Sequence, residues 1–327
     1  MSFPGGGLRP PSEAGAGPGV AIGVRAIPGP AARAFRLDPL VRREWRTVVG
    51  FLGPGVLFFV VLVAVPTVST VLLSFYRLES LISTPRWVGL ANYAAVLGEP
   101  RFWNALLNGI VYGAASVVLQ VVLGLPIALL LNLRFRGQAL VRGTALVPYV
   151  IPTVVVVFIW KWMLDENIGI VNHALKLAGG TPVSWFSAPA IAMASTVLVG
   201  VWAWTPFVTI TFLAALQTVN EELYEAARVD GATAGQRLRY VILPAVRPVL
   251  VIIVLLRAIW MFNKFDVIWM LTQGGPLQAT EHLPVLAYRM AFGLYDVGGG
   301  AAVATINFLL LLAVVAVYFR LVRVDET

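Results

Sequence analysis

The sequence predicts an all-α, polytopic membrane protein with six transmembrane helices. Of its 327 residues, 59% are hydrophobic and only 12% are charged, whereas soluble domains are about 45–50% apolar and about 25% charged. Apolar runs of roughly 20 residues, the length a helix needs to cross a bilayer, recur along the chain. A water-soluble fold of this length could not bury so much apolar surface, so most of the chain is expected to lie in lipid.

The N-terminal segment, residues 1–45, differs from the rest in composition. It is rich in glycine, proline and alanine, with scattered arginines. Such a composition cannot build a packed core, so it predicts a disordered basic cytoplasmic tail. A cleavable secretion signal fits less well, because the first long apolar run begins only near Phe51. Residues 46–327 are predicted to form one six-helix permease domain.

The six predicted spans follow one another along that domain, and several of them contain proline. Neighbouring helices and Ser/Thr side chains can satisfy the backbone groups that proline frees in a membrane helix. The predicted spans are residues 51–76, 106–133, 145–164, 189–216, 248–271 and 297–319.

The basic residues predict the orientation. If the N-terminus is cytoplasmic, sixteen Lys and Arg residues fall on the inside and five on the outside, as the positive-inside rule requires. Both termini are therefore predicted to lie in the cytoplasm of a multi-pass protein of the cell (inner) membrane. The net charge of +8 follows this topology rather than a nucleic-acid partner. The chain has no cysteine, which excludes disulfides and thiolate chemistry.

A patterned polar segment, residues 219–246, joins the fourth and fifth spans. Asn220 can cap a helix, and two glutamates in the first turn suit its positive N-terminus. The helix is predicted over residues 221–229, ending where Gly231 can take the left-handed conformation.

A second short helix is predicted in the same segment. Thr233 and Gln236 have the spacing of a capping box. Pro244 is expected to end this helix. The segment thus predicts two short helices joined by a sharp turn and held beneath the membrane by the spans on either side.

The same segment carries a recognisable motif. Its residues are Glu225, Ala226 and Ala227, then Asp230, Gly231 and Ala232, then Leu243 and Pro244. This pattern resembles the EAA loop of ABC-type importer permeases. The resemblance implies that these eight residues form the loop that couples the chain to an ATPase subunit, with its helix docked in a cleft of that subunit.

Further stretches resemble the maltose/glycerol-phosphate/multiple-sugar branch of these permeases. They include residues 87–93 with Phe102 and Trp103, and residues 265–268 with 271–276. The resemblance implies an importer permease that forms, with a second permease subunit, the membrane path for a sugar or related polyol. It implies two ATPase subunits and an extracytoplasmic solute-binding protein as further partners, with ATP and Mg on the ATPase and no cofactor on this chain.

Polar and aromatic residues at membrane depth are candidates for the solute path, because such groups are costly there. Carboxamides or carboxylates with an aromatic platform suit a sugar. Lys264 and Asp266 are expected on different faces of a regular helix and not to pair, whereas Asn263 should share a face with Asp266. Interface anchoring for the tryptophans and helix packing for Asn263 remain alternatives. The candidates are Trp202, Trp204, Asn263, Asp266 and Asn307.

Other classes of function lack their signatures. The sequence has no phosphate-binding loop, so ATP must bind another polypeptide if transport is ATP-driven. A membrane enzyme is disfavoured, because the two histidines, His173 and His282, lie outside the predicted spans and far apart. A secondary transporter of a small polar solute is the alternative, but no midplane ion relay or internal repeat is evident. The chain is therefore expected not to be an enzyme itself.

Overall fold

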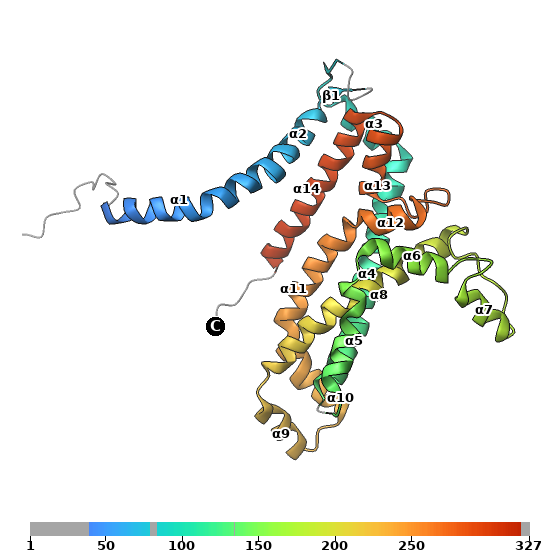
Figure 1. Ribbon diagram of the computed structural model, residues 1–327. Helices are drawn as coiled ribbons and strands as arrows, with labels where there is room; N and C mark the ends of the chain where they lie inside the picture. Colours follow the sequence, from blue (N-terminus) through green and yellow to red (C-terminus); the bar gives the residue numbers. More distant parts are fainter. Residues whose placement is uncertain (1–38, 79–83, 134, 322–327) are drawn as a thin grey trace, which may run out of the picture. The chain divides into compact units, whose positions relative to one another are not determined.

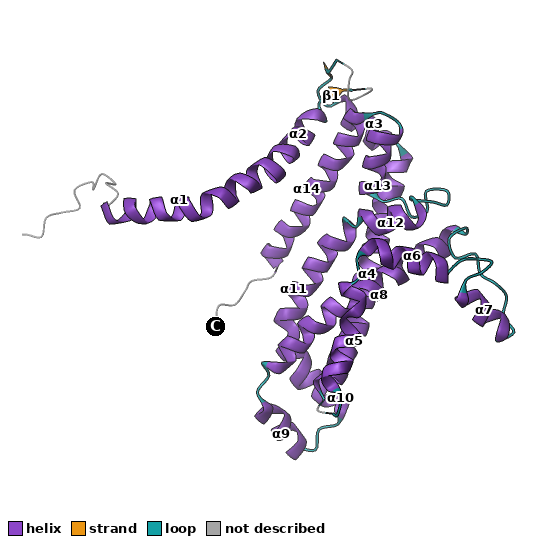
Figure 2. Ribbon diagram, in the orientation of Figure 1, coloured by secondary structure: helices purple, strands orange, loops and turns teal. Residues whose placement is uncertain are grey.

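The structure, a computed structural model, describes residues 39–78, 84–133 and 135–321. These residues are almost entirely helical (Figures 1 and 2). Two short strands within them, β1 (Tyr76–Arg77) and β2 (Arg86–Trp87), pair as an antiparallel hairpin. The chain divides into two compact units, Met1–Val60 and Val61–Thr327. Most of the predicted tail, residues 1–38, lies outside the described residues, and the first helix begins at Pro39.

The helices follow in the order that the sequence predicts, and the all-α fold class is confirmed. The first half contains α1 (Pro39–Phe59), η1 (Val60–Ala64), α2 (Val65–Leu73), α3 (Ala91–Gly98), α4 (Pro100–Asn132), α5 (Gln138–Val150), α6 (Thr153–Met163) and α7 (Ile170–Leu177). The second half contains α8 (Pro189–Gln217), α9 (Glu221–Val229), α10 (Ala234–Arg237), η2 (Leu238–Ile242), α11 (Leu243–Phe262), α12 (Phe265–Thr272), α13 (Leu283–Tyr288), η3 (Arg289–Gly293) and α14 (Val297–Leu321).

Five helical stretches in the described part of the chain are long and apolar enough to cross a membrane, and a bent pair makes a sixth candidate. The continuous stretches are Thr47–Leu73, Pro100–Asn132, Pro189–Gln217, Ala234–Phe262 and Val297–Arg320. Four of these agree with the first, second, fourth and sixth predicted spans within a few residues at most ends. The exceptions, at the third and fifth spans, each have a local cause.

The third span is broken. Instead of one helix over residues 145–164, α5 and α6 meet at 93°. Ile151 has φ −67° and ψ 132°, which is extended backbone. It precedes Pro152, and the proline ring disfavours the helical conformation of the residue before it. The proline thus redirects the chain where the sequence predicted a continuous helix.

The fifth span begins earlier and ends earlier than predicted. Pro244 was expected to end the second helix of the preceding loop, and that expectation is wrong. The helix runs on from α10 through the π-helical turn η2 into α11, with Pro244 in the first turn of α11. Proline has no backbone N–H to donate, and the wider π-helical turn accommodates it without ending the helix. At the other end, α11 stops at Phe262 and α12 is a separate helix.

Small residues let the central helices of the second unit pack closely, with α4 against α8 and α11 (Figure 1). A Cβ on Gly124 of α4 would lie 2.8 Å from Val208 Cγ1 of α8. On another face of α4, a Cβ on Gly109 would lie 3.1 Å from the Phe262 ring of α11. Large side chains at these positions would separate the helices that frame the break in the fifth span.

Candidate functional site

The site forms where the fifth span breaks. Asn263 caps the end of α11, and Lys264 has φ −79° and ψ 84°, outside the helical region. The next helix, α12, starts at Phe265 with Asp266 in its first turn, where a carboxylate suits the positive helix end. Because the helix is interrupted, Asn263 and Asp266 do not share one regular helix face, contrary to the sequence-based expectation.

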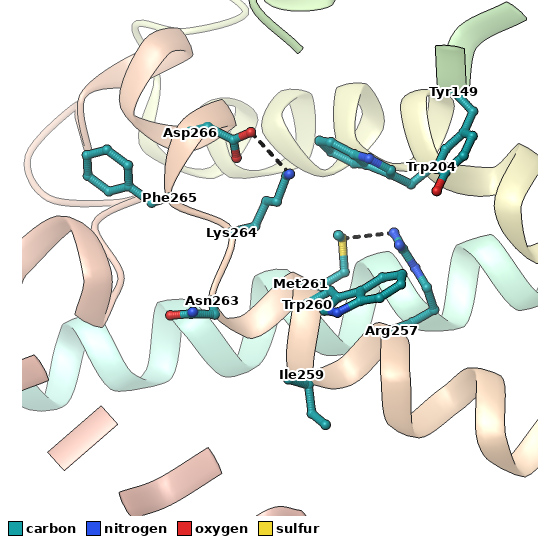
Figure 3. Close-up of a pocket in the computed structure, with 10 residues that line it drawn as sticks. All are labelled: Tyr149, Trp204, Arg257, Ile259, Trp260, Met261, Asn263, Lys264, Phe265 and Asp266. Carbon is teal, nitrogen blue, oxygen red and sulfur yellow. Dashed lines mark hydrogen bonds and ion pairs between the residues drawn. The ribbon is translucent and has the colours of Figure 1, made fainter. Parts of the chain in front are cut away.

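A cavity of about 440 Å³ lies at this break (Figure 3). Pockets that hold small molecules usually combine apolar walls with a few converging polar groups, and this one does. Its walls come from α5, α8 and the α11–α12 break, and the lining residues are Tyr149, Trp204, Arg257, Ile259, Trp260, Met261, Asn263, Lys264, Phe265 and Asp266.

Lys264 lies between an anion and an aromatic ring in this cavity (Figure 3). Its Nζ is 3.1 Å from Asp266 Oδ2 and 4.2 Å from the centre of the Trp204 ring. The expectation that Lys264 and Asp266 would not pair is therefore wrong. It assumed a regular helix, and the non-helical backbone at Lys264 brings the two side chains to the same side.

Arg257 is the largest fully buried side chain among the described residues, with 1% of its surface exposed. Its Nε donates to Gln120 Oε1 of α4 at 2.8 Å. Its guanidinium lies over the Trp260 and Phe207 rings, 5.5 and 5.8 Å from their centres. In the part of the chain that the structure describes, no carboxylate forms an ion pair with it.

Sequence reasoning did not select Arg257 as a site residue. A signal was nevertheless present, since a cation in the middle of an otherwise apolar run is costly in a membrane and points to function. What the sequence could not supply was the direction of the side chain. Only the packing of α11 on α4 brings Arg257 to Gln120 and to the cavity wall.

The five predicted solute-path residues separate into two groups. Trp204, Asn263 and Asp266 line the cavity. Trp202 instead packs edge-on against Trp160 of α6, with ring centres 5.6 Å apart. Asn307 of α14 is also behind the wall, where its Nδ2 donates to Asn263 Oδ1 at 3.1 Å. The structure thus places Asn307 as a support for Asn263.

An ionic cluster lies in the segment after α12. The buried carboxylate of Glu281 meets Arg101 of α4, with Nε–Oε2 at 2.7 Å and Nη2–Oε1 at 2.9 Å. It also meets Arg289 Nε at 2.8 Å. These contacts join α4, the α12–α13 connection and η3, which are far apart in sequence. They fix the segment that follows the cavity.

His282, next to this cluster, is fully buried and bonds to the break itself. Its Nε2 lies 3.1 Å from the carbonyl oxygen of Lys264. Burial lowers the pKa of His282 to about 4, only partly offset by this backbone contact. The imidazole is therefore neutral at physiological pH and can donate its Nε2 proton to that carbonyl.

The polar loop between α8 and α11 has the caps that the sequence predicts. Asn220 Oδ1 accepts from the Glu222 N–H at 3.1 Å and starts α9. At the other end Gly231 has φ +73°. Its N–H bonds to the Arg228 carbonyl at 3.1 Å, and the Ala232 N–H bonds to the Ala227 carbonyl at 2.9 Å. This pair of bonds is a Schellman motif, and it makes the sharp turn after α9.

The second short helix of the loop starts with the predicted capping box. Thr233 Oγ1 accepts from the Gln236 N–H at 3.3 Å, and Gln236 Oε1 accepts from the Thr233 N–H at 2.8 Å. The loop is a projecting element (Figure 1).

Most of the predicted coupling residues face outward. Glu225, Ala226, Asp230, Gly231, Leu243 and Pro244 are exposed, whereas Ala227 is buried and Ala232 half-buried. Val229, at the end of α9, has 87% of its surface exposed. An exposed apolar side chain beside exposed carboxylates is a surface that another protein can bind.

Comparison with known proteins gives a consistent result over most of the chain. Residues 120–323 match the family model of the binding-protein-dependent transport system inner membrane component. The chain is 39% identical over 271 residues to the inner membrane ABC transporter permease protein YcjO of Escherichia coli, covering 81% of this chain and 90% of that protein.

Two further relatives have solutes in their names. The trehalose/maltose transport system permease protein MalF of Thermococcus litoralis is 36% identical, over 82% of this chain and 90% of that protein. The sulfoquinovosyl glycerol transport system permease protein SmoG of Agrobacterium fabrum is 32% identical, over 84% and 90%.

Solved structures support the fold. A chain of a bacterial ABC transporter involved in the import of the acidic polysaccharide alginate superposes with a TM-score of 0.75 at 21% identity. The superposition covers 88% of this chain and 98% of that one.

Proposed function

We propose a transport mechanism for this chain from the premise that it belongs to the family of binding-protein-dependent transport system inner membrane components. It is a multi-pass permease subunit of an ABC importer of the sugar type. The cavity at the α11–α12 break and the exposed loop between α8 and α11 carry out separate parts of that role.

The cavity at the α11–α12 break is the proposed solute site of this subunit. The observation that carries this proposal is the convergence of an aromatic face, Trp204, with Asn263 and Asp266 around about 440 Å³. A sugar presents apolar ring faces and hydroxyl edges, so a ring can stack on the indole while the carboxamide and the carboxylate bond hydroxyls. Asn307 positions Asn263, and Trp202 supports the wall through α6.

The exposed loop is the proposed contact with an ATPase subunit. We assign it Glu225, Ala226, Ala227, Asp230, Gly231 and Ala232, with Leu243 and Pro244 joining it to the fifth span. The second helix of the loop, α10, continues through η2 into α11 without a break. A displacement of the docked loop is therefore carried along α11 toward the cavity at its other end, which suits a rocking movement between inward- and outward-facing states.

The complete importer is proposed to contain a second permease, two ATPase subunits and an extracytoplasmic solute-binding protein. Both termini of this chain lie in the cytoplasm of a cell inner-membrane protein, with the loop on the same side. ATP and Mg bind the ATPase subunits, and this chain binds no cofactor and hydrolyses no ATP. The solute-binding protein meets the outer segments 87–103 and 277–294.

Reconstitution tests this proposal. The tagged chain is purified with its partners in mild detergent, placed in proteoliposomes, and assayed for uptake of radiolabelled sugars and polyols with solute-binding protein supplied. Uptake that requires ATP and falls at least about tenfold in Trp204→Ala is expected. Uptake driven by an ion gradient without ATP would instead identify a secondary transporter.

Trp45→Ala is the matched control. Trp45 is an exposed tryptophan of α1 and does not line the cavity. Its replacement should leave uptake unchanged. Equal loss in both variants would show that the effect on Trp204 comes from general damage to the protein rather than from the site.

A further inference from the structure

The charges around the cavity do not cancel. Lys264 and Asp266 neutralise one another at 3.1 Å. Arg257 is left with a full positive charge, because a guanidinium is protonated at physiological pH. In the described residues that line the cavity, the sum is one net positive charge.

The surroundings of Arg257 compensate this charge only in part. Gln120 contributes one carbonyl oxygen at 2.8 Å and Met261 a weak sulfur acceptor at 3.5 Å. Two aromatic rings contribute attraction to the cation but accept no conventional hydrogen bond. A guanidinium has five N–H donors, so its bonding capacity exceeds what these neighbours supply. Figure 3 shows the side chain at the cavity wall beside Trp260.

We propose that the solute carries a negatively charged group, a carboxylate, sulfonate or phosphate, and that Arg257 binds this group in the cavity. The inference rests on the proposed function and narrows it to acidic sugars or polyols. Oxygens of all three groups match the geometry of a guanidinium and form charge-assisted hydrogen bonds, which are shorter and stronger than neutral ones.

The remaining groups have compatible roles. Lys264 adds a second cation beside the indole ring of Trp204, and its pairing with Asp266 keeps that carboxylate from repelling an anion. Trp204 and Asn263 also line the cavity and can contact the neutral part of the solute. The lining therefore supplies groups for the charge and for the sugar ring.

A set of compounds that share one ring tests the proposal. Glucose, glucuronate, glucose 6-sulfate and glucose 6-phosphate differ at a single position. Their binding to the complex, purified from its native membrane with all partner subunits, is measured by isothermal titration and by tryptophan fluorescence. The anions are expected to bind at least about tenfold more tightly than glucose. This arm uses the unmodified protein, so it does not depend on whether a variant folds.

Substitutions show which residue causes the preference for anions. Arg257→Gln should abolish the preference for anions, and Arg257→Lys should retain part of it. Lys161→Gln is the control, because it removes an exposed cation that does not line the cavity and should leave the preference intact. Equal binding of glucose and the anions, a preference that survives in Arg257→Gln, or binding of none of the four compounds would overturn the proposal.

The same complex separates this inference from the proposed function. ATP-dependent uptake of neutral sugars without any anion preference would support the importer function and refute the acidic solute. Anion-selective binding without ATP-dependent uptake would support the anion site and refute the importer mechanism.

Discussion

The imidazole of His282 lies 3.1 Å from the carbonyl oxygen of Lys264. This contact joins the segment after α12 to the residue at which the fifth span breaks. It gives the backbone at the break a side-chain partner, and so it supports the conformation in which Lys264 reaches Asp266 and Trp204. The cavity thus depends on a residue outside its lining.

Acid should weaken this support. The folded protein lowers the pKa of His282 to about 4, whereas an exposed histidine titrates near 6.5. Between these values the unfolded chain binds more protons, so stability is complete above about pH 6.5 and falls as the pH drops toward 4. The loss reaches about 3 kcal/mol at its limit. Thermal unfolding of the purified complex from pH 7.5 to 4.5 measures it, and His282→Gln should flatten the dependence. Equal acid sensitivity in that variant would contradict the assignment.

The turn after α9 should be required for coupling. Gly231 has φ +73°, a conformation that costs a residue with a Cβ about 1–2 kcal/mol, and more for β-branched valine. Gly231→Val should therefore assemble and bind solute but lose most ATP-dependent uptake. The control is Gly235→Ala, because a Cβ there meets nothing within 4 Å and the backbone is helical. Normal uptake by Gly231→Val would refute the role of the turn.

The ion pair in the cavity should show coupling between its partners. Asp266→Asn leaves Lys264 without its anion and should lower uptake by about tenfold or more. The double variant Lys264→Gln/Asp266→Asn removes both charges and should lose less uptake than the losses of the two single variants added together. Expressed as a free energy, this difference is about 0.5–3 kcal/mol. Uptake rates of the four proteins form the cycle. Strict additivity would mean that the observed pair contributes nothing during transport.

Removing the charge of Glu281 should destabilise the protein. Its buried carboxylate is paired with the partly exposed Arg101 and Arg289, and a hydrogen bond to a charged group contributes about 1.5–3 kcal/mol. Glu281→Gln should lower the melting temperature of the complex measured in detergent. Glu99→Gln, at an exposed N-cap position whose side chain makes no cap hydrogen bond, should lower it far less. A Glu281→Gln complex as stable as the unmodified one would show that the cluster is not structural.

Local signals predicted the loop well. The caps at Asn220 and Thr233 and the left-handed Gly231 depend on residues a few positions apart, and each is found where the sequence places it. The positions of the first, second, fourth and sixth spans followed from hydropathy, which a bilayer enforces on every residue of a span.

The site was only partly predictable, because its geometry depends on breaks and on distant partners. A proline is compatible with a membrane helix, so the sequence alone does not reveal the 93° bend at Pro152. No proline or glycine marks the break at Lys264. The sequence therefore predicts a continuous helix there, in which Lys264 and Asp266 would not pair. Arg257 and Gln120 are 137 positions apart, and Arg101 and Glu281 are 180 apart. Such pairs become visible only once helix packing is known.

The central claim, that the exposed loop couples this permease to an ATPase, has one direct test. The natural chain contains no cysteine, so Val229→Cys, at a site with 87% of its surface exposed, introduces a single reactive thiol at the end of α9. A thiol-reactive photo-crosslinker is attached in native membranes, and the adducts are identified by mass spectrometry with and without ATP. A single major adduct with a nucleotide-binding subunit, its yield changing with ATP, is the predicted result. The control is Val150→Cys, which is 76% exposed and lies outside the loop. The account would be contradicted if Val229→Cys formed no adduct with an ATPase and gave the same products as this control.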